Sequence, residues 1–134
     1  MAKTIQITFD AADPRALANF WAEALGYVIE APPESFTSWD EALTAFGVPE
    51  ELWNSRSAIV DPEGVGPRIF IQQVPEPKTA KNRVHLDVHV DPDRKEGDVA
   101  RLVALGAALT GVHSDRGPTT YVLRDPEGNE FCLH

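Results

Sequence analysis

Two histidines flank an aspartate at alternate positions, His85-x-Asp87-x-His89, and the residues between them are apolar. Successive side chains of a β-strand point to opposite faces, so these three would share one face of a sheet. There Asp87 could orient an imidazole and raise its basicity, which would create a general base that works near neutral pH. Residues two apart lie roughly 6.5–7 Å apart along a strand, so the side chains must reach toward each other to meet. We predict these three residues as catalytic, and the alternative is an ordinary solvent-facing strand surface.

The single cysteine, Cys132, has two interpretations. A lone cysteine is commonly a small, apolar core residue. As a nucleophile or a metal ligand it would need a lowered pKa, and His85 and His134 are the histidines expected near it.

The elements that must position these residues occur twice in the chain. The tetrapeptide Asp-Pro-Glu-Gly stands at 61–64 and again at 125–128, and the tripeptide Ala-Leu-Gly stands at 24–26 and at 104–106. An aspartate precedes each tripeptide glycine by 13 residues. The interval from that glycine to the next tetrapeptide is 35 residues in the first half and 19 in the second, so the first half carries 16 extra residues. Three landmarks in the same order indicate a duplicated unit.

The first half reads as a strand, a helix and three further strands. Residues 5–10 alternate between apolar and polar, which indicates a half-buried strand. Asp13 is predicted to cap a helix with Pro14 at its first position, and Gly26 is predicted to end it. Further strands are expected at 27–30, 57–60 and 68–74, with a loop or flap inserted at about 31–56 that contains a short helical stretch near 39–46.

The second half repeats this order. Residues 83–90 alternate as a strand, and Asp93 with Glu96 suggests a capping box for a helix that ends at Gly106. The helix would be apolar at Val99, Leu102 and Val103, and strands would follow at 108–112, 119–124 and 130–133. The sequence therefore predicts an α+β fold in which one domain, residues 1–134, consists of two βαβββ modules, module 1 at 3–74 and module 2 at 82–134.

With its Ala-Leu-Gly helix ends and its final hairpin Asp-Pro-Glu-Gly-Asn-Glu-Phe-Cys-Leu, the duplication resembles the vicinal oxygen chelate superfamily, which includes glyoxalase I, extradiol dioxygenases and bleomycin-binding proteins. The second module opens with Asn-Arg-Val-His-Leu-Asp at 82–87, similar to small glyoxalase-like members. The resemblance implies a half-open β-barrel with a concave cleft, helices on the outside and a homodimer. It implies metal-assisted lyase, isomerase or dioxygenase chemistry on a small molecule; the alternative is a metal-free protein that binds a drug or metabolite, as bleomycin-resistance proteins do.

Metal-binding members place one ligand on the first strand and one on the last strand of each module. The matching positions here are Gln6, Gln72, His85 and Cys132, with Gln73 as a one-residue alternative to Gln72. The resemblance therefore implies a divalent metal such as Ni, Zn, Mn or Fe. Family sites usually carry glutamates at the second and fourth positions, so Gln72 and Cys132 depart from the pattern and leave less negative charge to balance a cation.

If the apolar parity of each strand faces the helices, the opposite parity lines the cleft. That set is Gln6, Thr8, Phe70, Gln72, His85, Asp87, His89, Glu130, Cys132 and His134. Phe70 is predicted to contact the ligand, and Trp39 and Trp53 in the insert are either packing anchors or an aromatic lid over a flat ligand. Arg68, Arg83, Arg116 and Arg124 flank the strands; an arginine that faces the cleft would pair with a carboxylate or phosphate, and Arg83 is the one we predict.

The composition limits the partners. Twelve lysines and arginines stand against 21 acidic residues, which gives a net charge of −9. Such an excess repels phosphate backbones and anionic lipid, so neither nucleic acid nor a membrane is expected as a partner. A single cysteine cannot close an internal disulfide, which favours a cytoplasmic location. The sequence has no phosphate-binding loop and no apolar run of 18 residues, so neither a nucleotide cofactor nor a membrane span is expected.

Overall fold

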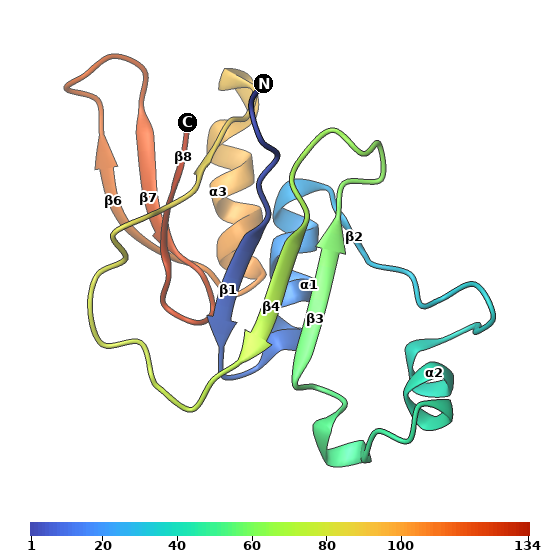
Figure 1. Ribbon diagram of the computed structural model, residues 1–134. Coiled ribbons are helices and arrows are strands. Elements are labelled where there is room, and N and C mark those ends of the chain that lie inside the picture. The colour runs from blue at the N-terminus through green and yellow to red at the C-terminus, as the bar shows by residue number, and fades with distance from the viewer. The chain divides into compact units, whose positions relative to one another are not determined.

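The computed structural model describes residues 1–134 and divides into two compact units, residues 1–75 and 76–134 (Figure 1). Each unit contains one four-stranded sheet with a helix of ten or more residues. No helix is both long enough and apolar enough to span a bilayer.

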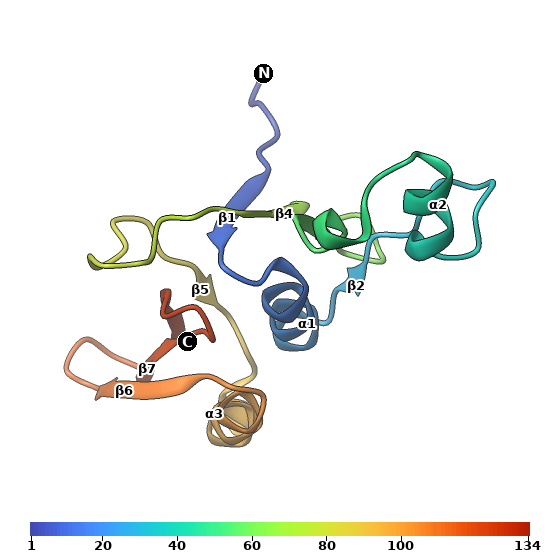
Figure 2. The same ribbon diagram turned by 90° about the horizontal axis from the view of Figure 1, so that it is seen from below.

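Unit 1 contains all the elements expected of the first half. They are β1 (Ile7–Ala11), α1 (Pro14–Leu25), β2 (Val28–Ile29), α2 (Trp39–Ala45), a 3-10 turn (Glu50–Leu52), β3 (Arg56–Val60) and β4 (Ile69–Gln73). The strand order is β1-β4-β3-β2, with β1 and β4 parallel and the other pairs antiparallel. Figure 2 shows α1 on one side of this sheet.

Unit 2 repeats the arrangement. Its elements are β5 (Asp87–Val88), a 3-10 turn (Pro92–Arg94), α3 (Lys95–Ala104), β6 (Ala108–His113), β7 (Thr120–Arg124) and β8 (Glu130–Leu133). The strand order is β5-β8-β7-β6, again with the first strand parallel to the last. The α+β class and the two βαβββ modules are confirmed, and the half-open barrel implied by the resemblance stays a prediction.

Helix α1 begins and ends as its sequence predicts. The Asp13 carboxylate accepts a hydrogen bond from the backbone N–H of Ala16, Pro14 occupies the first turn, and Gly26 ends the helix in the left-handed region at φ 72°. Leu17 and Trp21 are buried, so the apolar stripe packs against the sheet. This anchors the strands of unit 1.

The capping box predicted for α3 is wrong. Pro92 opens a 3-10 turn that already contains Asp93, so Asp93 cannot take the extended backbone of an N-cap residue. Arg94 takes the N-cap position and no side chain caps the helix. Lys95 is instead buried, and its ammonium donates to the carbonyl of Thr119 at 2.9 Å.

The strand predicted at 83–90 is shorter than expected, since only Asp87 and Val88 form β5. Backbone bonds from Cys132 to Leu86 and from Val90 to His134 nevertheless continue the pairing on both sides. The alternation therefore holds from His85 to Val90, where the apolar residues are half-buried and the polar ones are exposed, whereas Val84 is 83% exposed. This alternation places the histidines on one face.

Both Asp-Pro-Glu-Gly segments form the predicted turns between antiparallel strands. Asp61 accepts backbone N–H groups of its own turn, and Asp125 does the same in the other unit. Gly64 and Gly128 close the turns with φ of 72° and 87°, a region that side chains with a Cβ disfavour.

Candidate functional site

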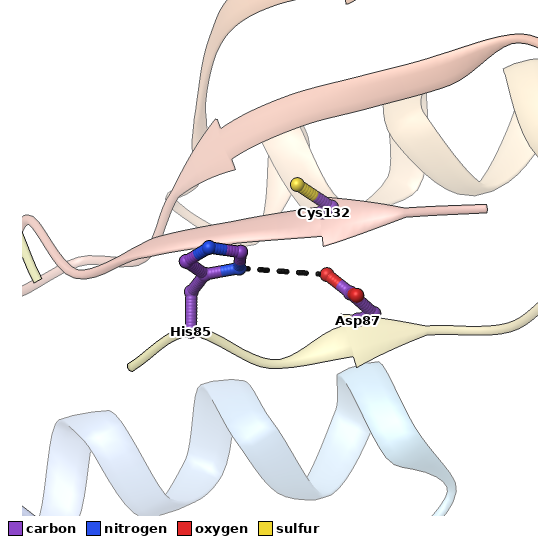
Figure 3. A group of neighbouring side chains, drawn as sticks. All are labelled: His85, Asp87 and Cys132. Atoms are coloured by element: carbon purple, nitrogen blue, oxygen red, sulfur yellow. Dashed lines mark ion pairs between the residues drawn. The ribbon is translucent and has the colours of Figure 1, made fainter. Parts of the chain in front are cut away.

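The polar face of unit 2 gathers three side chains that can hold a metal ion. Asp87 of β5 is the direct partner of Cys132 of β8 in the parallel ladder, and His85 lies two residues before Asp87. Figure 3 shows the three side chains together. One ligand atom from each residue lies within 4.8 Å of the others, and His85 Nδ1 is 3.5 Å from Asp87 Oδ1. We call His85, Asp87 and Cys132 the triad.

The triad fits a small divalent cation. In a tetrahedral zinc site with bonds of 2.0–2.3 Å, neighbouring ligand atoms lie roughly 3.3–3.7 Å apart. The His85–Asp87 separation already has that length, and no separation among the three ligand atoms exceeds 4.8 Å. Asp87 and a deprotonated Cys132 would supply two negative charges, which match the charge of the ion. Three protein ligands leave one coordination position open, as in catalytic zinc sites.

The Cys132 thiol is not an activated nucleophile. Partial burial raises its pKa, and the neighbouring Asp87 carboxylate, which attracts the proton, raises it further. A thiol in such surroundings stays protonated near neutral pH unless a cation binds it. The geometry therefore favours Cys132 as a ligand over Cys132 as a catalytic nucleophile.

His134 joins this face, as its predicted position in the cleft implies, although it was not predicted as a catalytic or metal-binding residue. Its Nε2 lies 3.7 Å from Asp87 Oδ1, on the opposite side of the ring from Nδ1, which is 3.2 Å from the Thr120 hydroxyl. His89 lies beside His134, with ring centroids 5.6 Å apart and planes inclined by 31°. The sequence signal for this proximity was the position of His134 two residues after Cys132, directly after the end of β8.

The glutamines predicted as metal ligands belong to unit 1 and are engaged there. Gln6 Oε1 accepts from Arg68, and Gln72 Nε2 donates to Asp10 at 2.8 Å. Asp10 is four residues beyond Gln6 and is the direct partner of Gln72, so Gln6 and Gln72 are offset by about four residues, or roughly 13 Å, along the strand direction. The alternative, Gln73, donates to the carbonyl of Ala12. The site built from Gln6, Gln72, His85 and Cys132 stays a prediction.

Three of the other predicted ligand contacts, Phe70, Trp39 and Trp53, lie in unit 1. The Phe70 ring in β4 is half-buried, with the Arg68 guanidinium 5.5 Å from its centroid. The indole N–H of Trp39 donates to the carbonyl of Glu30, and that of Trp53 donates to the carbonyl of Val48. These bonds favour the packing interpretation of both tryptophans. Arg83 is exposed ahead of β5, and its contact with a ligand stays a prediction.

Comparisons with known proteins show the family of this chain. A family model described as a glyoxalase-like domain matches residues 6–134. No curated protein matches the chain. Among solved structures, the chain is similar to a glyoxalase/bleomycin resistance protein/dioxygenase family enzyme from Burkholderia phytofirmans PsJN, with 18% identity, a TM-score of 0.68 and coverage of 98% of this chain and 97% of the other.

Two further solved structures have the same fold. A possible glyoxalase from Bacillus cereus shares 13% identity with a TM-score of 0.66, and the match covers 99% of this chain and 98% of the other. A mutant of the fosfomycin resistance protein FosX from Listeria monocytogenes, complexed with Mn(II) and 1S,2S-dihydroxypropylphosphonic acid, shares 14% identity with a TM-score of 0.68. That match covers 100% of this chain and 92% of the other.

Proposed function

The chain belongs to the glyoxalase-like domain family of the vicinal oxygen chelate superfamily, and from this membership we propose that it acts on a small molecule with a divalent metal ion held by His85, Asp87 and Cys132. The observation that carries the proposal is the approach of the three ligand atoms to within 4.8 Å. The FosX structure with Mn(II) and a phosphonate supports metal chemistry in this fold.

The donor set favours zinc within the predicted group of Ni, Zn, Mn and Fe. Thiolate and imidazole are the softer ligands and suit zinc, whereas manganese prefers oxygen ligands. A bound metal would supply Lewis acidity that stabilises negative charge on a substrate oxygen. The chain's own residues would orient the ion, because His85 Nδ1 and His134 Nε2 both lie near Asp87 Oδ1, at 3.5 and 3.7 Å, and can orient that carboxylate.

Zinc calorimetry on the full chain tests the proposal. We expect stoichiometric zinc binding, together with zinc in the elemental analysis of the purified protein. Asp87→Asn should weaken zinc binding at least about tenfold, because it removes one anionic ligand. Asp115→Asn makes the same change in an exposed loop and should leave the affinity within about twofold. A folded parent that binds neither zinc nor another divalent ion would contradict the proposal.

The metal-free binding protein remains the second candidate. The observation that favours it is that the chain itself surrounds the Asp87 carboxylate with polar partners, since Oδ1 lies 3.5 Å from His85 Nδ1 and 3.7 Å from His134 Nε2. A metal-free purified protein that retains a co-purified small molecule after extensive dialysis would favour this alternative, since the ligand would then be held by the chain alone.

We also propose that the protein forms a homodimer, as the resemblance implies. Light scattering at micromolar concentration should give twice the chain mass of 14.7 kDa. A mass of one chain would contradict the homodimer and would leave the proposed metal triad untouched, because all three of its residues lie in unit 2.

A further inference from the structure

A pocket of about 410 Å³ lies in unit 2. It is lined by the segment that leads into β5 and by β6, β7, β8 and the turn between the last two, through Lys78, Thr79, Ala80, Lys81, Thr110, Val122, Arg124, Glu127, Gly128 and Glu130. The volume lies within the range of small-molecule sites. We call it the β7–β8 pocket.

The β7–β8 pocket adjoins the triad on the same face of the sheet. Val122, which lines it, is the direct partner of Cys132 across β7 and β8, and Cys132 is in turn the partner of Asp87. Directly paired residues project to the same face of a sheet. Glu130, another lining residue, lies two residues before Cys132 on β8. A small molecule in the pocket would therefore lie next to the triad.

One acid–base pair in the pocket is already internally balanced. The Lys78 ammonium lies 3.2 Å from Glu130 Oε1 and also donates to the carbonyl of Ala80. Glu130 Oε2 accepts the backbone N–H of Asn82 at 2.9 Å. Because the Lys78 ammonium and the Glu130 carboxylate already have partners, we do not expect either of them to be the main binding group for a charged ligand.

Two other cations in the pocket lack an acidic partner. Arg124 extends from the exposed end of β7, and no acidic side chain lies within ion-pair distance of its guanidinium. Lys81 has only a 3.4 Å contact with the carbonyl of Asn82. The pocket lining contains three basic residues against two acidic ones, Glu127 and Glu130, whereas the whole chain carries a net charge of −9.

We propose that the β7–β8 pocket binds the anionic group, a carboxylate or a phosphate-type group, of the small molecule on which the protein acts, through Arg124 and Lys81. A guanidinium presents parallel N–H donors that match two oxygens of either group. A cationic ligand would instead face two positive charges without acidic partners. The sequence predicts Arg83 for this role, whereas the pocket contains Arg124.

The identity of this ligand as the substrate rests on the proposed function, but anion binding by the pocket does not require a metal. Titration of the full chain with inorganic phosphate and, separately, with acetate tests it by NMR, at constant ionic strength and after metal removal on a chelating resin. We expect saturable shifts at the amides of Lys81, Arg124 and Gly128. Binding of both anions, or of one alone, supports the proposal and narrows the anionic group.

Variants identify the groups that bind. Arg124→Ala should weaken phosphate binding about tenfold or more, because a hydrogen bond between charged partners is lost. Arg116→Ala removes the same charge from the exposed β6–β7 loop and should change the affinity less than about twofold. The proposal is overturned if neither anion produces saturable shifts at these amides, or if Arg124→Ala and Arg116→Ala bind phosphate equally. Because no metal is present, that failure is distinct from a failure of zinc calorimetry.

Discussion

Asp87 and Cys132 are direct partners in the parallel ladder between β5 and β8, although 45 residues separate them in the chain. The pairing places a carboxylate and a thiol on one face of unit 2, and His85, two residues before Asp87 in the chain, reaches the same carboxylate. This relationship changes the role of Asp87. The sequence suggests a residue that orients a catalytic imidazole, and the structure adds a donor set in which the carboxylate itself can bind a metal.

Substitution of Cys132 should remove a sulfur ligand that can be followed by spectroscopy. In the parent, Co(II) bound to the triad should give the near-ultraviolet absorption of a thiolate–metal bond. Cys132→Ser should abolish this band and weaken metal binding at least about tenfold, because the hydroxyl is a poor ligand compared with a thiolate. The absorption spectrum of a cobalt titration measures both effects. Since Cys132 is the only cysteine, a band that survives in the variant would refute the triad.

Because of Glu130, the free energy of unfolding should depend on pH in the acidic range. Its hydrogen bond from the Asn82 N–H, together with the Lys78 ammonium, lowers the pKa of Glu130 from 4.5 to about 2. A lowered folded-state pKa means that the unfolded chain binds the proton more readily, so the stabilisation is complete above about pH 4.5 and is lost as the pH falls toward 2.

Glu130→Gln lacks this titration. The difference in the free energy of unfolding between parent and variant should therefore be constant above about pH 5 and shrink below pH 4.5. Urea unfolding of both proteins between pH 6 and about pH 2.5 measures it. A difference that stays unchanged throughout would show that the Glu130 carboxylate is not stabilised in the folded state.

Substitution by alanine should change the free energy of unfolding in opposite directions at Gly26 and at Gly97. Gly26 ends α1 at φ 72° and Gly97 lies inside α3, and a Cβ at either position meets no atom within 4 Å. Backbone strain at Gly26 should therefore make Gly26→Ala destabilising by about 1 kcal/mol. Gly97→Ala should stabilise by about 0.5–1 kcal/mol through helix propensity. Urea unfolding of the two variants serves as a matched comparison, and two changes of the same sign would contradict it.

The carboxylate of Asp125 should contribute more to stability than that of Asp61, its counterpart in unit 1. Asp125 is 4% exposed and accepts from the backbone N–H groups of Glu127 and Asn129. Asp125→Ala should cost about 2–3 kcal/mol, since these donors would lose a charged acceptor away from water. Asp61→Ala should cost less, because the half-exposed turn of unit 1 lets water replace the carboxylate. Equal losses in chemical denaturation would contradict this reasoning.

The amino-acid sequence determined the features that depend on neighbours along the chain. The repeated motifs indicated two βαβββ modules, and the cap at Asp13 and the end of α1 at Gly26 followed from residues within one helical turn. The alternation of His85, Asp87 and His89 placed them on one exposed face for the same reason, since a strand repeats every two residues. The capping role of Asp93 failed because the local 3-10 turn at Pro92 competes with the pattern.

The tertiary structure decided which distant side chains meet. The sequence places His85 and Cys132 at cleft positions, but only strand register sets Asp87 opposite Cys132 and brings His134 to 3.7 Å from the carboxylate. Likewise, Arg83 and Arg124 are equivalent in the sequence as arginines that flank strands, and only the fold places Arg124 in a pocket without an acidic partner. The local alternation of a strand shows which face of the sheet each side chain occupies. Which residue of the neighbouring strand lies opposite that side chain depends on the pairing of segments that are distant in the sequence.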